Sequence, residues 1–235
     1  MTTELITTSA TPAVLTAFAG LGDETGYENV EDVNVRAFIQ LANHKNHLEW
    51  ADGIKFGDIY NTLTGEICHE LLFIPCYVHK YVAEYEGTNK FVKQHSIDSE
   101  EYQKACAKAI DKKTNRIKYK EVKSDSGNTL TASHDVYALV SHDGGDTWMP
   151  AVIPMQSSKI KPYERFFKTL RLRQTRLFEN VCQLGVKEQK GDDGAFFNYT
   201  FKWIGCLQDE SLARMIVEYI QQTKISIAER EDDSL

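Results

Sequence analysis

Side-chain chemistry alternates most clearly between residues 71 and 85. From 72 to 82 the even-numbered positions are aliphatic apart from Lys80: Leu72, Ile74, Cys76, Val78 and Val82. The odd-numbered positions carry an aromatic set: Phe73, Tyr77, His79, Tyr81 and Tyr85. Successive side chains of a strand point to opposite faces of its sheet. The pattern therefore predicts a strand with an aliphatic face inside and an aromatic face outside.

Two hairpins are predicted further along the chain. Apolar or β-branched runs at 136–140 and 149–155 flank the turn residues Asp143-Gly144-Gly145-Asp146. A second pair of runs, at 180–188 and 195–205, flanks the turn 191–194, and its return strand carries Phe197, Tyr199, Phe201 and Trp203. Glycine and aspartate between alternating runs are typical of hairpin loops.

Helical periodicity is clearest after Ser157-Ser158, where serine can cap a helix and Pro162 is tolerated in the first turn. At 100° per residue one side is apolar and the other basic; the apolar side holds Tyr163, Phe166, Phe167 and Leu170, and the basic side holds Lys161, Arg165 and Lys168, with Arg171 at its margin. A short helix at 99–110 and an amphipathic terminal helix at 210–224 are also predicted.

The chain as a whole is predicted to fold as one domain with two polar ends. Residues 1–34 are rich in Thr, Gly and acid and are expected to form a flexible arm, and residues 228–235 an acidic C-terminal tail. Residues 35–227 form the domain, in which the lysine-rich stretch 87–133 is an inserted excursion. We expect a mainly β (α+β) fold, an OB-like antiparallel barrel or curved sheet with a basic amphipathic helix and a C-terminal helix.

Composition narrows the class of protein. The 235 residues carry 27 basic and 34 acidic side chains, a net charge of −7, so a nucleic-acid surface requires local segregation of charge. Five cysteines are an odd number and form no C-x-x-C pair, which indicates neither a disulfide framework nor a metal site; they are Cys68, Cys76, Cys106, Cys182 and Cys206. The apolar stretch 12–21 lacks a preceding basic residue, and no window is long enough to span a membrane. We expect a cytoplasmic protein without cofactors.

Residues 159–176 contain seven basic side chains and one acid, Glu164, in a chain that is acidic elsewhere. Aromatic strand faces beside a basic helix are typical of single-stranded nucleic-acid binding, where bases stack on rings and cations follow the phosphates. Two simpler interpretations remain open: the rings form an ordinary core, and the helix presents a solvated face paired with carboxylates.

The candidate contacts with DNA fall into two groups. The stacking candidates are the aromatic residues Tyr77, Tyr81, Phe197, Tyr199 and Trp203. The phosphate candidates are the basic residues Lys80, Lys161, Arg165, Lys168, Arg171, Arg173 and Lys202.

Enzymatic signatures are weak. His134-Asp135, His142-Asp143 and the Asp143/Asp146 pair could serve a metal or acid–base site, but these aspartates lie in a glycine turn, where a turn role is the simpler interpretation. The sequence contains no P-loop, no H-E-x-x-H and no G-x-S-x-G. We therefore expect a binding protein rather than an enzyme.

A set of short segments spread along most of the chain forms a recognisable pattern: 18–21, 27–30, 56–66, 73–77, 150–155, the Ser157-Ser158 helix start, and 201–205. In these segments the chain resembles a family of tailed-bacteriophage single-stranded DNA-binding proteins with an OB fold. It implies sequence-independent binding and protection of single-stranded DNA during phage replication or recombination in the infected host cell. It also implies contact with phage replication or recombination proteins, which the acidic tail is suited to make. The sequence leaves open whether the protein forms a homo-oligomer.

Two other functions are left open by the sequence. One is a DNA-processing enzyme or strand-annealing recombination enzyme, and the other is a structural or interaction protein of the virion.

Overall fold

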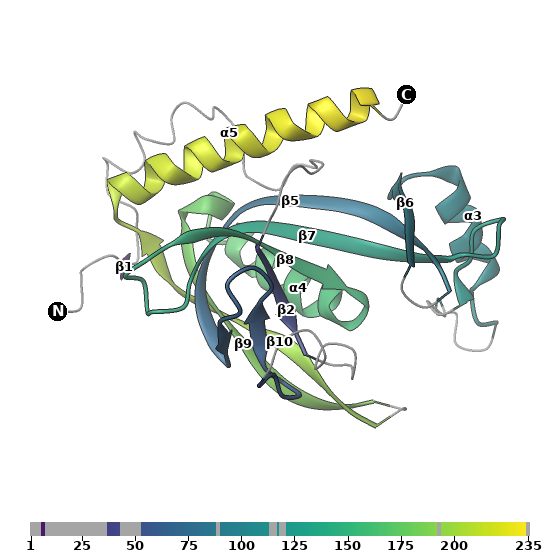
Figure 1. Ribbon diagram of the computed structural model, residues 1–235, viewed down its shortest axis with the longest axis horizontal. Coiled ribbons are helices and arrows are strands. Elements are labelled where there is room, and N and C mark those ends of the chain that lie inside the picture. Colours follow the sequence, from purple (N-terminus) through teal and green to yellow (C-terminus); the bar gives the residue numbers. More distant parts are fainter. Residues whose placement is uncertain are drawn as a thin grey trace. The chain divides into compact units, whose positions relative to one another are not determined.

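The computed structural model describes residues 6–7, 37–42, 53–87, 90–112, 117, 121–191 and 194–233, with side chains described up to Ile225 (Figure 1). The chain forms two compact units. The first comprises Met1–His79, Asp135–Pro154 and Lys161–Leu235, and the second comprises Lys80–His134 and Met155–Ile160. The predicted arm at 1–34 lies almost entirely outside the described residues.

In the ranges given above, ten strands form the sheet. They are β1 (Ile6–Thr7), β2 (Ala37–Leu41), β3 (Ile59–Asn61), β4 (Ile67–Cys68), β5 (Glu70–Glu86), β6 (Lys90–Ser96), β7 (Thr129–Ser141), β8 (Met149–Gln156), β9 (Asn180–Gly191) and β10 (Gly194–Leu207). Their order is β1-β10-β9-β5-β7-β8-β2-β3-β4, and β6 pairs with β5. The predicted long strand and both hairpins are confirmed, whereas β2 and β8 pair in parallel.

The sheet of the first unit curls over its core. The Tyr199 hydroxyl on β10 donates to the Ile39 carbonyl on β2 at 3.1 Å, although these strands are not neighbours in the sheet. Ile39, Ile59 and Phe73 are fully buried. The mainly β fold with a curved, OB-like sheet is therefore confirmed.

The described residues contain three α-helices besides the sheet: α3 (Glu100–Lys108), α4 (Ile160–Arg171) and α5 (Glu210–Asp233). Short 3-10 turns, Ser157–Lys159 and Leu177–Glu179, precede α4 and β9. The terminal helix is longer than predicted, because its backbone continues beyond Lys224 into the acidic segment. None of the helices in the described ranges is long and apolar enough to cross a membrane.

The expected aromatic outer face of β5 is wrong over its first half, because Phe73, Tyr77 and His79 are all buried. Tyr77 packs in a cluster with Tyr137 and Val152, against which Tyr219 of α5 also lies. The ammonium of Lys224 lies 5.7 Å from the centre of the Tyr77 ring. The terminal helix thus covers a face that the alternation had assigned to solvent.

In the second unit, α3 packs against the far half of β5. Tyr102 and Ala105 join Val82, Val122 and Leu130 in one buried cluster. Ser99 caps the helix, accepting a hydrogen bond from the Tyr102 amide at 3.4 Å, and Glu100 and Glu101 occupy the first turn, where carboxylates favour a helix. The short helix expected in this stretch is therefore present.

Candidate nucleic-acid interface

The outer side of α4 carries a continuous basic strip. Its apolar residues Tyr163, Phe167 and Leu170 are buried, as their helical spacing predicts. The strip, here called the basic helix surface, consists of exposed residues: Lys161, Arg165, Lys168 and Arg171 of α4 and Arg173 in the turn after it. Within the described part of the chain, Lys161, Arg165 and Lys168 have no carboxylate partner.

The aromatic row of β10 lies beneath α4 rather than beside it. Phe201 stacks on Phe166 of α4 with ring centres 5.4 Å apart and an angle of 17° between the planes. Phe201 also meets Phe73 edge-on, with the centres 6.2 Å apart. These contacts make Phe201 part of the core, which supports the interpretation that the rings in the middle of this row form an ordinary core.

Two of the predicted stacking residues offer no open ring face. Tyr77 and Tyr199 are each only 1% exposed. Burial, with smaller contributions from Tyr60 and Cys68, raises the pKa of Tyr199 far above its usual range, so its hydroxyl stays protonated and able to donate to Ile39. Both rings are structural in this arrangement.

Phe197 is half-buried and rests on the backbone of Gly57. A Cβ atom added to Gly57 would lie 2.8 Å from the Phe197 ring, and the glycine has φ +90°, which side-chain-bearing residues rarely adopt. The close contact fixes the ring against the turn before β3.

Trp203 is the aromatic candidate that lies next to the basic helix surface. Its ring is half-buried, and the Arg173 guanidinium carbon lies 4.0 Å from the ring centre. A cation over the face of an indole is favourable. Lys202 is exposed, but as the neighbour of Trp203 on the strand it points to the opposite face of the sheet.

A buried amide, which the sequence did not single out, holds this corner together. Asn180 is fully buried and donates to the Arg176 carbonyl at 2.6 Å and the Leu177 carbonyl at 3.2 Å. Its side-chain oxygen accepts from Thr175 Oγ1 at 3.2 Å and from Trp203 Nε1 at 3.1 Å. Asn180 therefore ties the turn after α4 to Trp203, although nothing in its sequence position distinguishes it from an ordinary strand-entry asparagine.

Lys80 and Tyr81 belong to the second unit, and both side chains are half-buried. Within the first unit the structure brings together the α4 candidates, Arg173 and Trp203. In the same unit Tyr77 and Tyr199 are buried, and Lys202 points to the opposite face of the sheet from Trp203.

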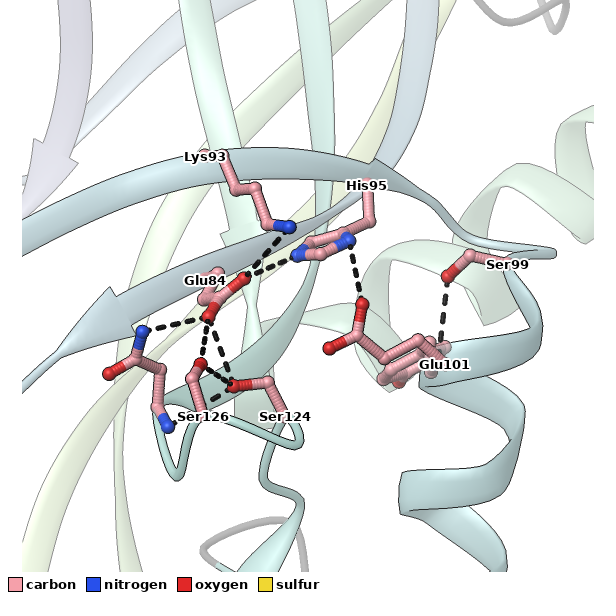
Figure 2. Close-up of polar contacts among 9 residues, drawn as sticks. Glu84, Lys93, His95, Ser99, Glu101, Ser124 and Ser126 are labelled. Atoms are coloured by element: carbon pink, nitrogen blue, oxygen red, sulfur yellow. Dashed lines mark hydrogen bonds and ion pairs between the residues drawn. The ribbon is translucent and has the colours of Figure 1, made fainter.

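The polar centre of the second unit is built around Glu84, which is 2% exposed. Figure 2 shows its carboxylate from β5 facing His95 and Lys93 of β6 and the serines of the turn that precedes β7. Ser124 Oγ, Ser126 Oγ and Asn128 Nδ2 donate to Oε1 at 3.0, 3.1 and 2.8 Å, and His95 Nε2 lies 2.6 Å from Oε2.

Around this centre, His95 Nδ1 lies 3.5 Å from Glu101 of α3. Removal from solvent raises the pKa of Glu84, but the hydrogen bonds from Asn128, His95, Ser124 and Ser126 outweigh it and lower the pKa to about 2. The carboxylate, ionised at neutral pH, holds the 124–128 turn against the sheet through these hydrogen bonds, which is a structural role.

Cys68, His142 and Glu66 come close together in the first unit. Cys68 Sγ lies 3.6 Å from His142 Nδ1, and His142 Nε2 lies 3.9 Å from Glu66 Oε2. Burial and the Glu66 charge raise the pKa of the Cys68 thiol to about 11. A nucleophilic cysteine needs a lowered pKa, so this arrangement does not favour covalent catalysis.

The Asp143 turn has the expected structural role. Asp143 accepts from Ser141 Oγ at 2.7 Å and from the Thr147 amide at 3.0 Å and Thr147 Oγ1 at 2.5 Å. These hydrogen bonds hold its pKa far below its usual range. Among the described residues, no group of three or more His, Cys, Asp or Glu is arranged to hold a metal ion.

Comparison with known proteins identifies one family. Neither the curated proteins nor the solved structures that were searched contain a match to the chain. The family model described as Pam3 phage gp34-like protein matches residues 12–225, which is most of the chain and includes α4, β10 and the Glu84 centre. The chain therefore belongs to the Pam3 phage gp34-like protein family, a family of bacteriophage proteins.

Proposed function

We propose that this protein binds single-stranded DNA with little sequence preference, and that the basic helix surface is where the strand lies. The observation that carries the proposal is the set of exposed cations on α4, of which Lys161, Arg165 and Lys168 have no carboxylate partner in the described chain, in a protein of net charge −7. Exposed cations in such a row neutralise successive phosphates and release condensed counterions, which favours binding.

Trp203 supplies a ring beside these cations. Stacking of a base on an aromatic side chain contributes about 1–3 kcal/mol, and the Arg173 guanidinium over the Trp203 ring extends the flat surface. Because Tyr77 and Tyr199 are buried, they are left out of the proposed site. With few rings available, the affinity should be mainly electrostatic.

The biological context is consistent with this function. The chain belongs to a family of phage proteins. Its sequence segments resemble phage single-stranded DNA-binding proteins. On this proposal the protein coats replication or recombination intermediates in the infected host cell, as a binding protein without cofactor or catalysis. Its acidic C-terminal residues, 228–235, are suited to contact phage replication or recombination proteins.

The experiment is a titration of fluorescent oligo-dT at several salt concentrations with the wild type and the double variant Arg165→Ala/Lys168→Ala. For single strands, log affinity falls with log salt by about 0.7 per neutralised phosphate, so losing two contacts should shallow the slope by about 1.4. The matched control is Lys187→Ala/Lys190→Ala, which removes two exposed lysines from β9 and changes the net charge equally.

An unchanged slope in the α4 variant would remove the helix from the site. An equal change in both variants would mean that general charge, not this surface, determines binding. Duplex of equal length competing as well as oligo-dT would contradict the preference for single strands. Cleavage or pairing of labelled strands with Mg²⁺, or abundant copies in purified particles, would favour an enzyme or a virion component instead.

A further inference from the structure

Leu172 is the most exposed large apolar residue in the described chain. Its side chain is 84% exposed, in the turn that follows α4. The turn is ordered by backbone hydrogen bonds, from the Leu172 amide to the Lys168 carbonyl at 3.2 Å and from the Arg173 amide to the Leu170 carbonyl at 2.9 Å. Exposed arginines, Arg171 and Arg173, stand on either side of it.

Single exposed apolar side chains are common and need no partner. Leu172 differs in being held out on a fixed turn between two cations, one of which is anchored over Trp203. We call Leu172 with its two flanking arginines the projecting turn.

The same unit contains a pocket of about 370 Å³ whose chemistry is the complement of this turn. Its lining includes the apolar side chains of Trp148, Leu212 and Met215 and two acidic residues, Asp146 and Asp209. Trp148 is fixed as a wall because its indole N–H donates to the Gly145 carbonyl at 3.0 Å.

The carboxylate of Asp209 is held in a fixed orientation, as Trp148 is. It accepts hydrogen bonds from the amides of Ser211 at 2.8 Å and Leu212 at 3.1 Å and so caps α5. Partial burial raises the pKa of Asp209, but these hydrogen bonds and that from the Ser211 hydroxyl lower it overall, and the group is charged at neutral pH.

We propose that this pocket receives the projecting turn of a second copy of the protein, with Leu172 between the apolar walls and the arginines facing Asp146 and Asp209. The protein's own Leu172 does not fill the pocket, because that side chain is exposed to solvent. The occupant is a second copy because one chain carries both an apolar side chain flanked by two cations and an apolar pocket lined by two acidic residues.

Such a contact joins two different patches, so each copy can bind one neighbour through its projecting turn and another through its pocket. A single side chain and its flanks bury much less than the area of a stable protein interface, so association of the free protein should be weak. The contact itself does not depend on DNA. This contact is separate from the proposed function: Arg171 and Arg173 also belong to the basic helix surface, so a strand bound there would compete with the contact.

The test is sedimentation velocity and light scattering of the full chain without DNA, from the low micromolar range to about 1 mM. We expect the weight-average mass of the wild type to rise above the monomer mass of 26.8 kDa. Leu172→Asp and Met215→Asp each place a carboxylate in the contact, and each should weaken association tenfold or more, because burial of a leucine is lost in both.

Matched controls receive the same substitution elsewhere. Leu63→Asp changes a leucine that is 58% exposed between two threonines, and Ile225→Asp changes a residue of α5 that is 61% exposed and does not line the pocket. Both should associate as the wild type does. Circular dichroism should show that all four variants are folded, since each changes a side chain exposed to solvent.

Mixing the two deficient variants gives the decisive result. Leu172→Asp retains an intact pocket and Met215→Asp retains an intact projecting turn, so their mixture should form pairs and stop at twice the monomer mass. Rising salt should weaken both the wild-type association and the pairing. A wild type that is monomeric throughout, control variants that lose association equally, or a mixture that does not pair would each overturn the proposal, and the first would leave the pocket to a different partner.

Discussion

The Glu84 centre allows a quantitative prediction about stability and pH. Hydrogen bonds lower the pKa of Glu84 from 4.5 to about 2 in the folded protein. A carboxyl group with a depressed folded pKa stabilises the fold above its unfolded pKa, and that stabilisation is lost as the pH falls from about 4.5 toward 2. The difference corresponds to on the order of 3 kcal/mol at neutral pH.

The perturbation is Glu84→Gln, which removes the negative charge. It also replaces one acceptor oxygen by an NH₂ group that faces the hydrogen-bond donors around Glu84. Urea unfolding should show a loss of about 3 kcal/mol at pH 7 relative to the wild type. The loss should shrink to about half by pH 3, because the unfolded wild-type chain is then protonated at Glu84 while the folded protein is not, and this favours unfolding of the wild type. Titrating groups remote from this centre are common to both proteins, so the difference reports Glu84 together with its direct partners, such as His95.

Glu101→Gln is the matched control. Its side chain is 33% exposed and it meets His95 at 3.5 Å, so solvent screens the interaction and the cost should stay below about 1 kcal/mol. The reasoning would be refuted by a Glu84→Gln loss that is constant from pH 7 to pH 3, or by one no larger than that of Glu101→Gln.

Two further substitutions test the packing around the candidate interface. Gly57→Ala should lower the free energy of unfolding by about 2–3 kcal/mol, because φ is +90° and the new Cβ would meet the Phe197 ring. Gly65→Ala, with φ +74° and open space around the new Cβ, should lower it by only about 1 kcal/mol. Equal losses for the two variants in urea unfolding would show that the contact with Phe197 has no effect on stability. Asn180→Ala should lower the free energy of unfolding by about 2–4 kcal/mol, since it leaves the Trp203 N–H and two carbonyls without their partner. Asn180→Asp retains the acceptor oxygen and should keep the Trp203 fluorescence closer to that of the wild type. An Asn180→Ala protein as stable as the wild type would contradict this account.

Local periodicity was sufficient to predict the elements that are long and regular. The alternation on β5, the glycine turns of the two hairpins and the opposed sides of α4 are all properties of neighbouring residues, and each is present in the structure. The expected outer face of β5 failed for a different reason. Alternation shows that two faces of a strand differ, but it does not show that α5, far along the chain, returns to cover Tyr77.

The candidate site was predictable only in part for the same reason. A basic strip within one helix can be recognised in the sequence, and its exposed residues were. The positions of Glu84 and Asn180 depend on partners brought in by tertiary folding, such as Asn128, which lies forty-four positions from Glu84, and Trp203, which lies twenty-three from Asn180. No local pattern marks either residue.

The two tryptophans within the described chain stand in different places, Trp203 under Arg173 and Trp148 in the wall of the pocket. Each is therefore placed to serve as an intrinsic fluorescent reporter of one of the two proposed events. A protein in which Trp50 and Trp148 are replaced by phenylalanine would report strand binding through Trp203, and one that keeps Trp148 alone would report self-association. The two proposed equilibria could then be followed separately, in two single-tryptophan variants, without an attached label.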